Sequence, residues 1–222
     1  MILRIIIAKI LFVVTVMGAN VSSAYDAELA ESSKCSRYFT LYEQEYHVPS
    51  NLIRAIGITE SGKLVKSNKQ RMAWPWTVNA KGKGYYFKSK REAIRAVKKF
   101  QAKGIKSIDV GCMQIKLKYH PEAFENLEQA FEPKYNIGYA AKFLHTKYLK
   151  LRNWKSAVGS YHNGKPSRHR KYIKKVYSAW RIADKSIDVA SNSYINLTDA
   201  SKASKTDAGV SALTRNVLSK FE

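Results

Sequence analysis

Apolar residues recur at helical spacing over much of the chain. Between residues 133 and 151 they follow one another at intervals of four and three, which places them along one face of a helix. A shorter run of the same kind lies within residues 26–46. The pattern predicts a helix over each stretch. The inward positions are predicted at Cys35, Tyr38 and Tyr42 in the first and at Ile137, Ala141, Leu144, Tyr148 and Leu151 in the second.

Three further helices are predicted from local signals. Ser89 followed by Glu92 forms a capping box that opens a helix ending before Gly104, and this structural task removes Glu92 from the candidate catalytic residues. A second helix begins near Asn153, and a basic third helix covers residues 168–183. Their inward faces are predicted at Ala93, Ile94, Val97 and Phe100, at Trp154, Ala157, Val158 and Tyr161, and at Ile173, Val176, Tyr177 and Trp180.

A short helix between Val48 and Gly62 carries a carboxylate on its apolar face. Pro49 suits its first turn, and Gly62 suits its C-terminal end. Glu60 lies four residues after Ile56, so it projects from the apolar stripe. Such a residue is either a hydrogen-bonded core residue or a catalyst. An apolar setting disfavours the charged carboxylate, which suits a general acid.

Two regions are predicted to be extended. Residues 72–79 and 84–87 are rich in aromatic and β-branched residues, and the intervening residues 80–83 are typical of a hairpin loop. The aromatic side chains form either a platform for sugar rings or a buried corner of the core. In residues 105–117, Gly111 indicates a turn or a close backbone approach to a ligand, and Gln114 needs partners from the backbone or from substrate. The fold class is therefore mainly α with a small β-hairpin.

The two ends of the chain differ from the middle. Arg4 and Lys9 precede an apolar run that is followed by small residues up to Ala24, a pattern typical of a secretory signal peptide. We expect residues 1–24 to be removed, residues 25–184 to form one domain, and the polar residues 185–222 to be a disordered tail. The mature protein is expected to be soluble and periplasmic.

The charge of the chain indicates an anionic partner. The full sequence carries a formal net charge of +22, which favours nucleic acid, an anionic membrane or a cell wall bearing carboxylates. Removal of the signal peptide takes away two positive charges and leaves about +20. Because an exported protein does not meet chromosomal DNA, we expect no nucleic-acid partner.

Cys35 and Cys112 are the two cysteines of the chain. Export places them in an oxidising compartment, which favours a disulfide between them over two free buried thiols. A bond closing a loop of this length stabilises the fold by roughly 4 kcal/mol in the chain-entropy model. Spacing alone does not show that the two thiols meet.

Three separated motifs together resemble the goose-type-lysozyme-like lytic transglycosylases, or SLT-domain family. The family has Glu-Ser-Gly, Gly-Leu-Met-Gln and Ala-Tyr-Asn motifs in this order. This sequence has Glu60-Ser-Gly62, Gly111-Cys-Met-Gln114 and Ser160-Tyr-His-Asn-Gly164. The resemblance spans roughly Val48 to Gly164, and Asn136-Ile137 matches a further family motif. The Trp-Pro-Trp hairpin resembles one branch of the family. The implied fold is a lysozyme-like helical domain with the hairpin beside a substrate groove.

The resemblance assigns a role to each matching residue. Glu60 corresponds to the catalytic acid and base, and Ser61 to the serine beside it that helps hold the substrate. Met113 and Gln114 correspond to a pair that lines the groove, and Tyr161 to a tyrosine near the catalytic carboxyl.

The sequence departs from the family pattern at three places. Cys112 stands where Leu is usual, which agrees with a disulfide. His162 replaces an Asn, so its role in substrate binding is carried over only weakly. Ala140 stands where the Asn-Ile motif has Gly.

The resemblance implies cleavage of the β-1,4 bond between N-acetylmuramic acid (MurNAc) and N-acetylglucosamine (GlcNAc), ending in a 1,6-anhydro ring. No cofactor or metal is implied, and Glu60 suffices as acid and base, with Asp109 a weak second carboxylate. Peptidoglycan strands are the expected partner of a monomeric protein. The resemblance leaves three questions open. They are whether proteins of an envelope-spanning machine are also partners, which cellular process the enzyme serves, and whether cleavage is exo or endo. The alternatives are a hydrolytic muramidase and a non-catalytic wall-binding protein.

Overall fold

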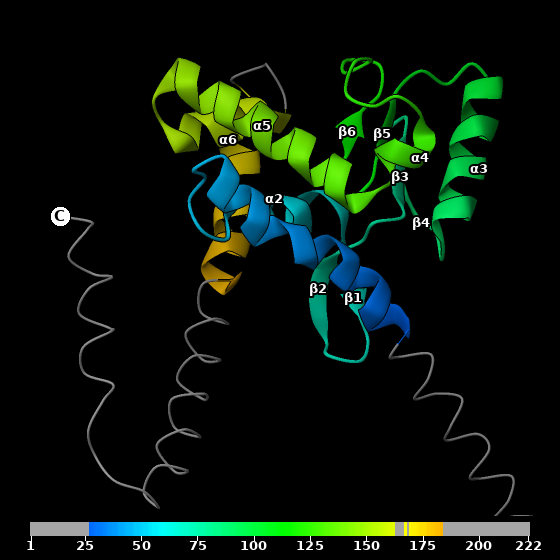
Figure 1. The fold of residues 1–222 in the computed structure, drawn as a ribbon, viewed down its shortest axis with the longest axis horizontal. Helices are drawn as coiled ribbons and strands as arrows, with labels where there is room; N and C mark the ends of the chain where they lie inside the picture. The colour runs from blue at the N-terminus through cyan, green and yellow to red at the C-terminus, as the bar shows by residue number, and fades with distance from the viewer. Residues whose placement is uncertain (1–26, 163–166, 168, 184–222) are drawn as a thin grey trace, which may run out of the picture. The chain divides into compact units, whose positions relative to one another are not determined.

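The computed structural model describes residues 27–162, 167 and 169–183 (Figure 1). The predicted signal peptide and the predicted tail lie outside the described residues, as do Asn163 and Gly164 of the third motif. The described part is mainly helical with small antiparallel sheets, which confirms the predicted fold class. None of the described helices is both long and apolar enough to cross a membrane.

Helices surround two small sheets. Residues 27–45 form an N-terminal helix, and residues 169–183 are helical at the other end of the described chain. Between them lie α2 (Leu52–Ser61), α3 (Lys90–Ala102), α4 (Leu127–Ala130), α5 (Pro133–Leu151) and α6 (Trp154–His162). The strands are β1 (Gly62–Val65), β2 (Gln70–Ala73), β3 (Thr77–Ala80), β4 (Lys83–Tyr86), β5 (Ile108–Val110) and β6 (Ile115–Lys116).

Helix α2 begins later than predicted, so the placement of Pro49 in its first turn is wrong. His47 and Asn51 both have positive φ, and these two left-handed residues turn the backbone before the helix starts at Leu52. The cap comes from the N-terminal helix, where the Glu43 carboxylate accepts hydrogen bonds from the N–H groups of Asn51 and Ile53, both at 2.9 Å. Burial raises the pKa of Glu43, and these bonds partly offset the effect.

The C-terminal end of α2 passes directly into a strand. Gly62 is the C-cap, and a Cβ at this position would overlap the carbonyl oxygen of Ile58. The strand β1 that follows pairs antiparallel with β2, with Gly62 opposite Ala73. This pair was not predicted, and the single extended segment expected over 72–79 is wrong. Its first two residues end β2, and its last residues belong to β3.

The predicted hairpin is confirmed in a shorter form. Strands β3 and β4 pair with Thr77 opposite Tyr86, and the connection consists of Lys81 and Gly82 alone. Both have positive φ, as a two-residue type I′ turn requires. The four-stranded sheet has the order β4-β3-β5-β6 and, in Figure 1, lies at the same end of the molecule as α3.

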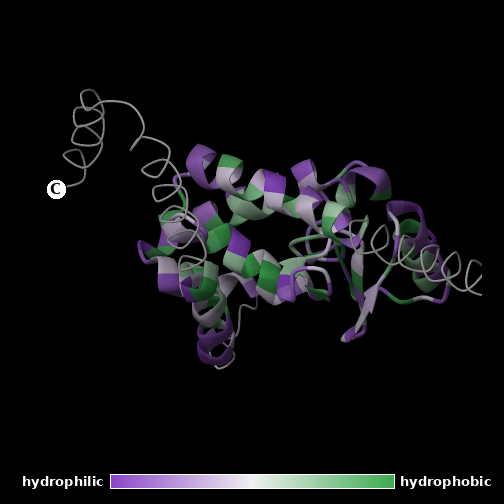
Figure 2. Ribbon diagram, turned by 90° about the horizontal axis from the view of Figure 1, so that it is seen from below, coloured by the Kyte–Doolittle hydropathy of each residue, from purple (hydrophilic) through white to green (hydrophobic). Residues whose placement is uncertain are grey.

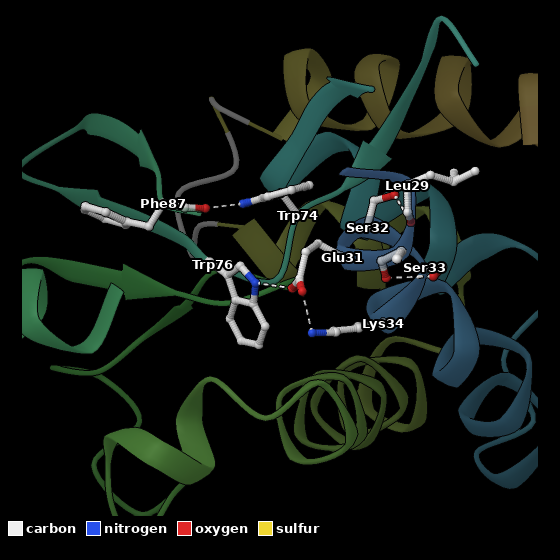
Figure 3. A network of polar contacts seen from close by, with 9 residues as sticks. Leu29, Glu31, Ser32, Ser33, Lys34, Trp74, Trp76 and Phe87 are labelled. Carbon is white, nitrogen blue, oxygen red and sulfur yellow. Dashed lines mark hydrogen bonds and ion pairs between the residues drawn. The ribbon is translucent and has the colours of Figure 1, made fainter. Parts of the chain in front are cut away.

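Trp74 and Trp76 are buried, with 3% and 4% of their surface exposed. The Trp74 indole N–H donates to the carbonyl oxygen of Phe87 at 2.7 Å, and that of Trp76 donates to Glu31 Oε2 at 2.6 Å (Figure 3). The other Glu31 oxygen accepts from Lys34 at 2.7 Å. Of the two interpretations of these aromatic residues, the structure supports the buried corner. The Trp76 bond joins the hairpin region to the N-terminal helix.

Two hydrophobic clusters form the core. The first packs α2 against the N-terminal helix, α5 and α6, and the second lies between the four-stranded sheet, α3 and α4. Hydrophobic and hydrophilic residues alternate along the same helices in Figure 2, as expected for helices with one buried face. Helix α5 has the predicted bounds, although Leu151 is 44% exposed because it lies in the last turn, beyond the buried stripe.

The predicted disulfide and capping box are both present. Cys35 and Cys112 are bonded, with their Cα atoms 6.0 Å apart, which ties the N-terminal helix to the loop after β5. Ser89 caps α3 by accepting from the N–H of Glu92 at 3.3 Å. The Glu92 carboxylate accepts from the N–H of Lys88 at 3.0 Å, so its structural assignment is confirmed.

Candidate active site

The three motifs converge through buried hydrogen bonds. The Ser61 hydroxyl, fully buried, donates to the carbonyl oxygen of Cys112 at 2.7 Å and accepts from the N–H of Trp74 at 3.2 Å. The Tyr161 hydroxyl donates to the carbonyl oxygen of Met113 at 2.9 Å. The loop at 111–114 is therefore held by the end of α2 on one side and by α6 on the other.

Asn136 holds the same loop from α5. Its amide nitrogen donates to the carbonyl oxygens of Val110 and Ala130, and its Oδ1 accepts from the N–H of Met113 at 2.9 Å. Gly111 has a φ of 80°, and a Cβ there would overlap the Asn136 amide. Of the two predictions for Gly111, the structure shows the turn, and the group that lies close to its backbone is the Asn136 side chain.

Gln114 finds its partners in the backbone. Its amide nitrogen donates to the carbonyl oxygens of Thr77 and Gly111 at 3.1 and 3.0 Å, and its own φ is 49°. These bonds connect the loop to β3. Met113, next to it, is fully buried in the first cluster.

The Glu60 carboxyl lies at the end of α2 with 12% of its side chain exposed. Its Oε1 accepts a hydrogen bond from the Tyr172 hydroxyl at 2.7 Å, and His162 Nδ1 lies 3.6 Å from the same oxygen. The His162 and Tyr172 rings stack with centroids 4.5 Å apart. Burial, and then the charge of Glu60, raise the pKa of Tyr172 well above its usual value, so the hydroxyl keeps its proton.

Glu60 lines a pocket of about 400 Å³ between the end of α2, the end of α6 and the helix at residues 169–183. The described residues that line it are Thr59, Glu60, His162, Ser167, Lys171, Tyr172 and Lys175. The pocket thus contains a shielded carboxyl, an imidazole beside it and two lysines.

Asp109 is a second carboxylate close enough to Glu60 for their charges to interact. It lies opposite Lys116 in the β5–β6 pair, and Lys116 Nζ is 3.4 Å from its Oδ1. Burial is the main factor that raises the pKa of Asp109. Lys116 lowers this pKa, and the negative charge of Glu60 raises it further. Asp109 does not line the Glu60 pocket.

Some of the predicted site residues line the pocket and others are buried beside it. Glu60 and His162 line the pocket, whereas Ser61 and Met113 are fully buried. Gln114 and Tyr161 are partly buried and use their polar atoms on backbone groups. Direct contact of these four residues with a substrate stays a prediction. In the structure they connect the segments around Glu60.

Sequence reasoning missed Tyr172. Residues 173, 176, 177 and 180 were predicted to face inward, yet Tyr172 is 6% exposed, whereas Ile173 and Tyr177 are only partly buried. Tyr172, Val176, Ala179 and Ala183 follow intervals of four, three and four, so this repeat was present as a signal. Its hydrogen bond to Glu60, 112 residues away in sequence, had no local signal.

In the part of the chain that the structure describes, no group of three or more His, Cys, Asp or Glu side chains is arranged to hold a metal ion. A family model described as "Transglycosylase SLT domain" matches residues 37–184, a range that includes every described residue of the pocket lining. No curated protein and no solved structure matched the chain.

Proposed function

The chain belongs to the transglycosylase SLT domain family, and from this premise we propose that it cleaves the β-1,4 bond between MurNAc and GlcNAc in peptidoglycan. The family consists of lytic transglycosylases, enzymes that degrade peptidoglycan. The observation that carries the proposal is the position of Glu60, a shielded carboxyl that accepts from Tyr172 and opens into a pocket. We propose Glu60 as the single acid and base.

Bond cleavage begins with proton transfer. Glu60 in its acid form gives its proton to the oxygen that bridges the two sugars, and the bond from that oxygen to C1 of MurNAc breaks. The carbonyl oxygen of the substrate's own N-acetyl group stabilises the positive charge that develops at C1. This assistance takes the place of a carboxylate nucleophile, which agrees with Asp109 lying outside the pocket lining.

Ring closure returns the proton to the enzyme. The ionised Glu60 takes the proton of the C6 hydroxyl, O6 bonds to C1, and the product is a 1,6-anhydro-MurNAc end. No water is consumed, and Glu60 is again an acid. The Tyr172 hydroxyl, which donates to Oε1, would hold the carboxyl in place during both steps.

The neighbouring motif residues would support catalysis by holding the segments around Glu60 in place. Ser61, Met113, Gln114 and Tyr161 connect the loop 111–114 to α2, α6 and β3. His162 faces Glu60 at 3.6 Å and has 49% of its side chain exposed, so it can reach both the carboxyl and a bound sugar.

The test is digestion of purified peptidoglycan followed by mass spectrometry of the products. We expect anhydro ends, each lighter by one water than a reducing end. Reducing ends would show a muramidase instead. Glu60→Gln should lower the rate by at least about a hundredfold. Glu125→Gln, which changes an exposed carboxylate away from the pocket, is the matched control.

Two further results bear on the roles of the carboxylates. Asp109→Asn should keep the rate within about threefold, because Glu60 acts alone; a loss as large as that of Glu60→Gln would show a two-carboxylate mechanism. A wild-type protein that sediments with peptidoglycan yet releases no product would support a non-catalytic wall-binding role.

A further inference from the structure

Two lysines in the Glu60 pocket have no task in the proposed bond cleavage. Lys171 and Lys175 belong to the helix at residues 169–183 and are four residues apart, so they lie on one face. Both line the pocket and both are exposed. Among the residues that the structure describes, neither has an ion-pair or hydrogen-bond partner.

The charges in the pocket are unbalanced. Glu60 is the one acidic residue among the described residues that line it, and its Oε1 is already engaged by Tyr172. The other described lining groups are the hydroxyls of Thr59 and Ser167 and the half-exposed imidazole of His162. Two ammonium groups one turn apart repel each other, and an anionic ligand would relieve this repulsion.

The chemistry of the substrate identifies such an anion. The glycan strand presents neutral hydroxyl and acetamido groups, and the lactyl carboxyl of MurNAc is consumed in an amide bond to the stem peptide. The free carboxylates of peptidoglycan belong to that peptide. The peptide is attached to MurNAc, the sugar whose C1 bond breaks at Glu60, so it must lie near the pocket.

We propose that Lys171 and Lys175 form a subsite for stem-peptide carboxylates, so that strands whose peptides carry free carboxylates are better substrates than strands whose peptide carboxyl groups are amidated. The inference rests on the proposed function. A lysine ammonium is a flexible point charge with three donors, which suits carboxylates whose position varies along a peptide.

The kinetic test compares two substrates made from one preparation. Peptidoglycan sacculi are used as isolated or after carbodiimide coupling of their free stem-peptide carboxyl groups to ammonia, which leaves neutral amides and keeps the cross-linked sacculus intact. We expect wild type to cleave the strands with free peptide carboxylates with the higher kcat/KM. In the double variant Lys171→Ala/Lys175→Ala this preference should fall about tenfold. Lys174→Ala removes an exposed charge of the same helix outside the pocket lining and should keep the preference.

A second readout does not depend on cleavage. The Glu60→Gln protein, with and without the two lysine substitutions, is pelleted with each kind of sacculi at low and high ionic strength. We expect the lysines to strengthen binding to the sacculi with free peptide carboxylates only, and salt to weaken that difference.

Two results would overturn the subsite. One is a wild type with no preference for strands with free peptide carboxylates, and the other is a double variant that loses rate or binding equally on both substrates. A wild type that cleaves neither substrate would instead count against the proposed function. The pelleting comparison would then decide the subsite by itself.

Discussion

The Glu60 carboxyl shows how a side chain acquires a specific setting from distant parts of the chain. Its Oε1 receives the Tyr172 hydroxyl at 2.7 Å, and the His162 ring lies against the same tyrosine. A hydrogen bond to one oxygen orients the carboxyl of Glu60, which lines the pocket. The position of Glu60 on α2 would not by itself have this effect.

Removing the Tyr172 hydroxyl tests this orientation. Tyr172→Phe keeps the ring that stacks on His162 and deletes the donor, so we expect a rate about tenfold lower with little change in thermal unfolding. Initial rates of product release measure the effect. Tyr177→Phe, on the same helix and only partly buried, is the control. Equal rates for wild type and Tyr172→Phe would show that the hydrogen bond has no catalytic consequence.

The raised pKa of Asp109 leads us to expect that the stability of the protein depends on pH. Burial raises the pKa of Asp109 above its usual value of 3.8, so the folded protein binds this proton more tightly than the unfolded chain. The stabilisation is fully present below about pH 3.8 and is lost as the pH rises through the folded-state pKa. Asp109→Asn lacks this loss, so its free energy of unfolding should improve relative to wild type as the pH rises.

Urea unfolding of wild type and Asp109→Asn over a series of pH values provides the measurement. The variant also removes the partner of Lys116, which adds an offset, so the trend with pH is the quantity to compare. A constant difference between the two proteins would contradict the raised pKa of Asp109.

At the scale of elements, short segments are held by groups that belong to other elements. Helix α2 is capped by Glu43 of the N-terminal helix, and its last residue, Ser61, bonds to the loop that follows β5. That loop is also held by Asn136 of α5 and Tyr161 of α6. The backbone around Glu60 is therefore positioned by at least four different segments of the chain.

The disulfide belongs to the same set of connections. Cys35 and Cys112 are 77 residues apart, and their bond should stabilise the fold by about 4 kcal/mol by restricting the unfolded chain. We expect Cys35→Ser/Cys112→Ser to lower the urea midpoint and to be insensitive to reductant. Wild type should move toward the double variant when it is reduced. Identical midpoints for oxidised wild type and the double variant would contradict this role.

The whole molecule combines a basic charge with a small helical domain. A net charge of +22 favours polyanions, and the family membership directs that preference to peptidoglycan rather than nucleic acid. To act on peptidoglycan the protein must also be exported, because this substrate lies outside the cytoplasm. The N-terminal pattern of Arg4, Lys9 and an apolar run predicts it.

Expression of the full chain in a bacterium tests the predicted export. We expect the protein in the periplasmic fraction with Tyr25 as its first residue, established by N-terminal sequencing, because cleavage after Ala24 follows a run of small residues. A chain without residues 2–24 should stay in the cytoplasm. Recovery of the uncut protein from the cytoplasm would contradict the signal peptide.

The sequence by itself determined the features that depend on local patterns. The bounds of α5, the capping box at Ser89 and the hairpin between β3 and β4 were predicted because helical repeats, caps and turns involve residues that are close in the chain. Glu60 was nominated because it lies on the apolar face of a short helix and is followed along the chain by two other recognisable motifs. The disulfide was favoured by the compartment, not by geometry.

Only the tertiary structure decided the features that depend on pairing between distant segments. It buried Trp74 and Trp76 and bonded Tyr172 to Glu60. It also placed Ser61 inside the protein, with its hydroxyl on a backbone carbonyl. A residue's own neighbours do not reveal these contacts. Ser61 and Cys112 are 51 residues apart and Glu60 and Tyr172 are 112 residues apart, and each partner is chosen by how the helices and sheets pack.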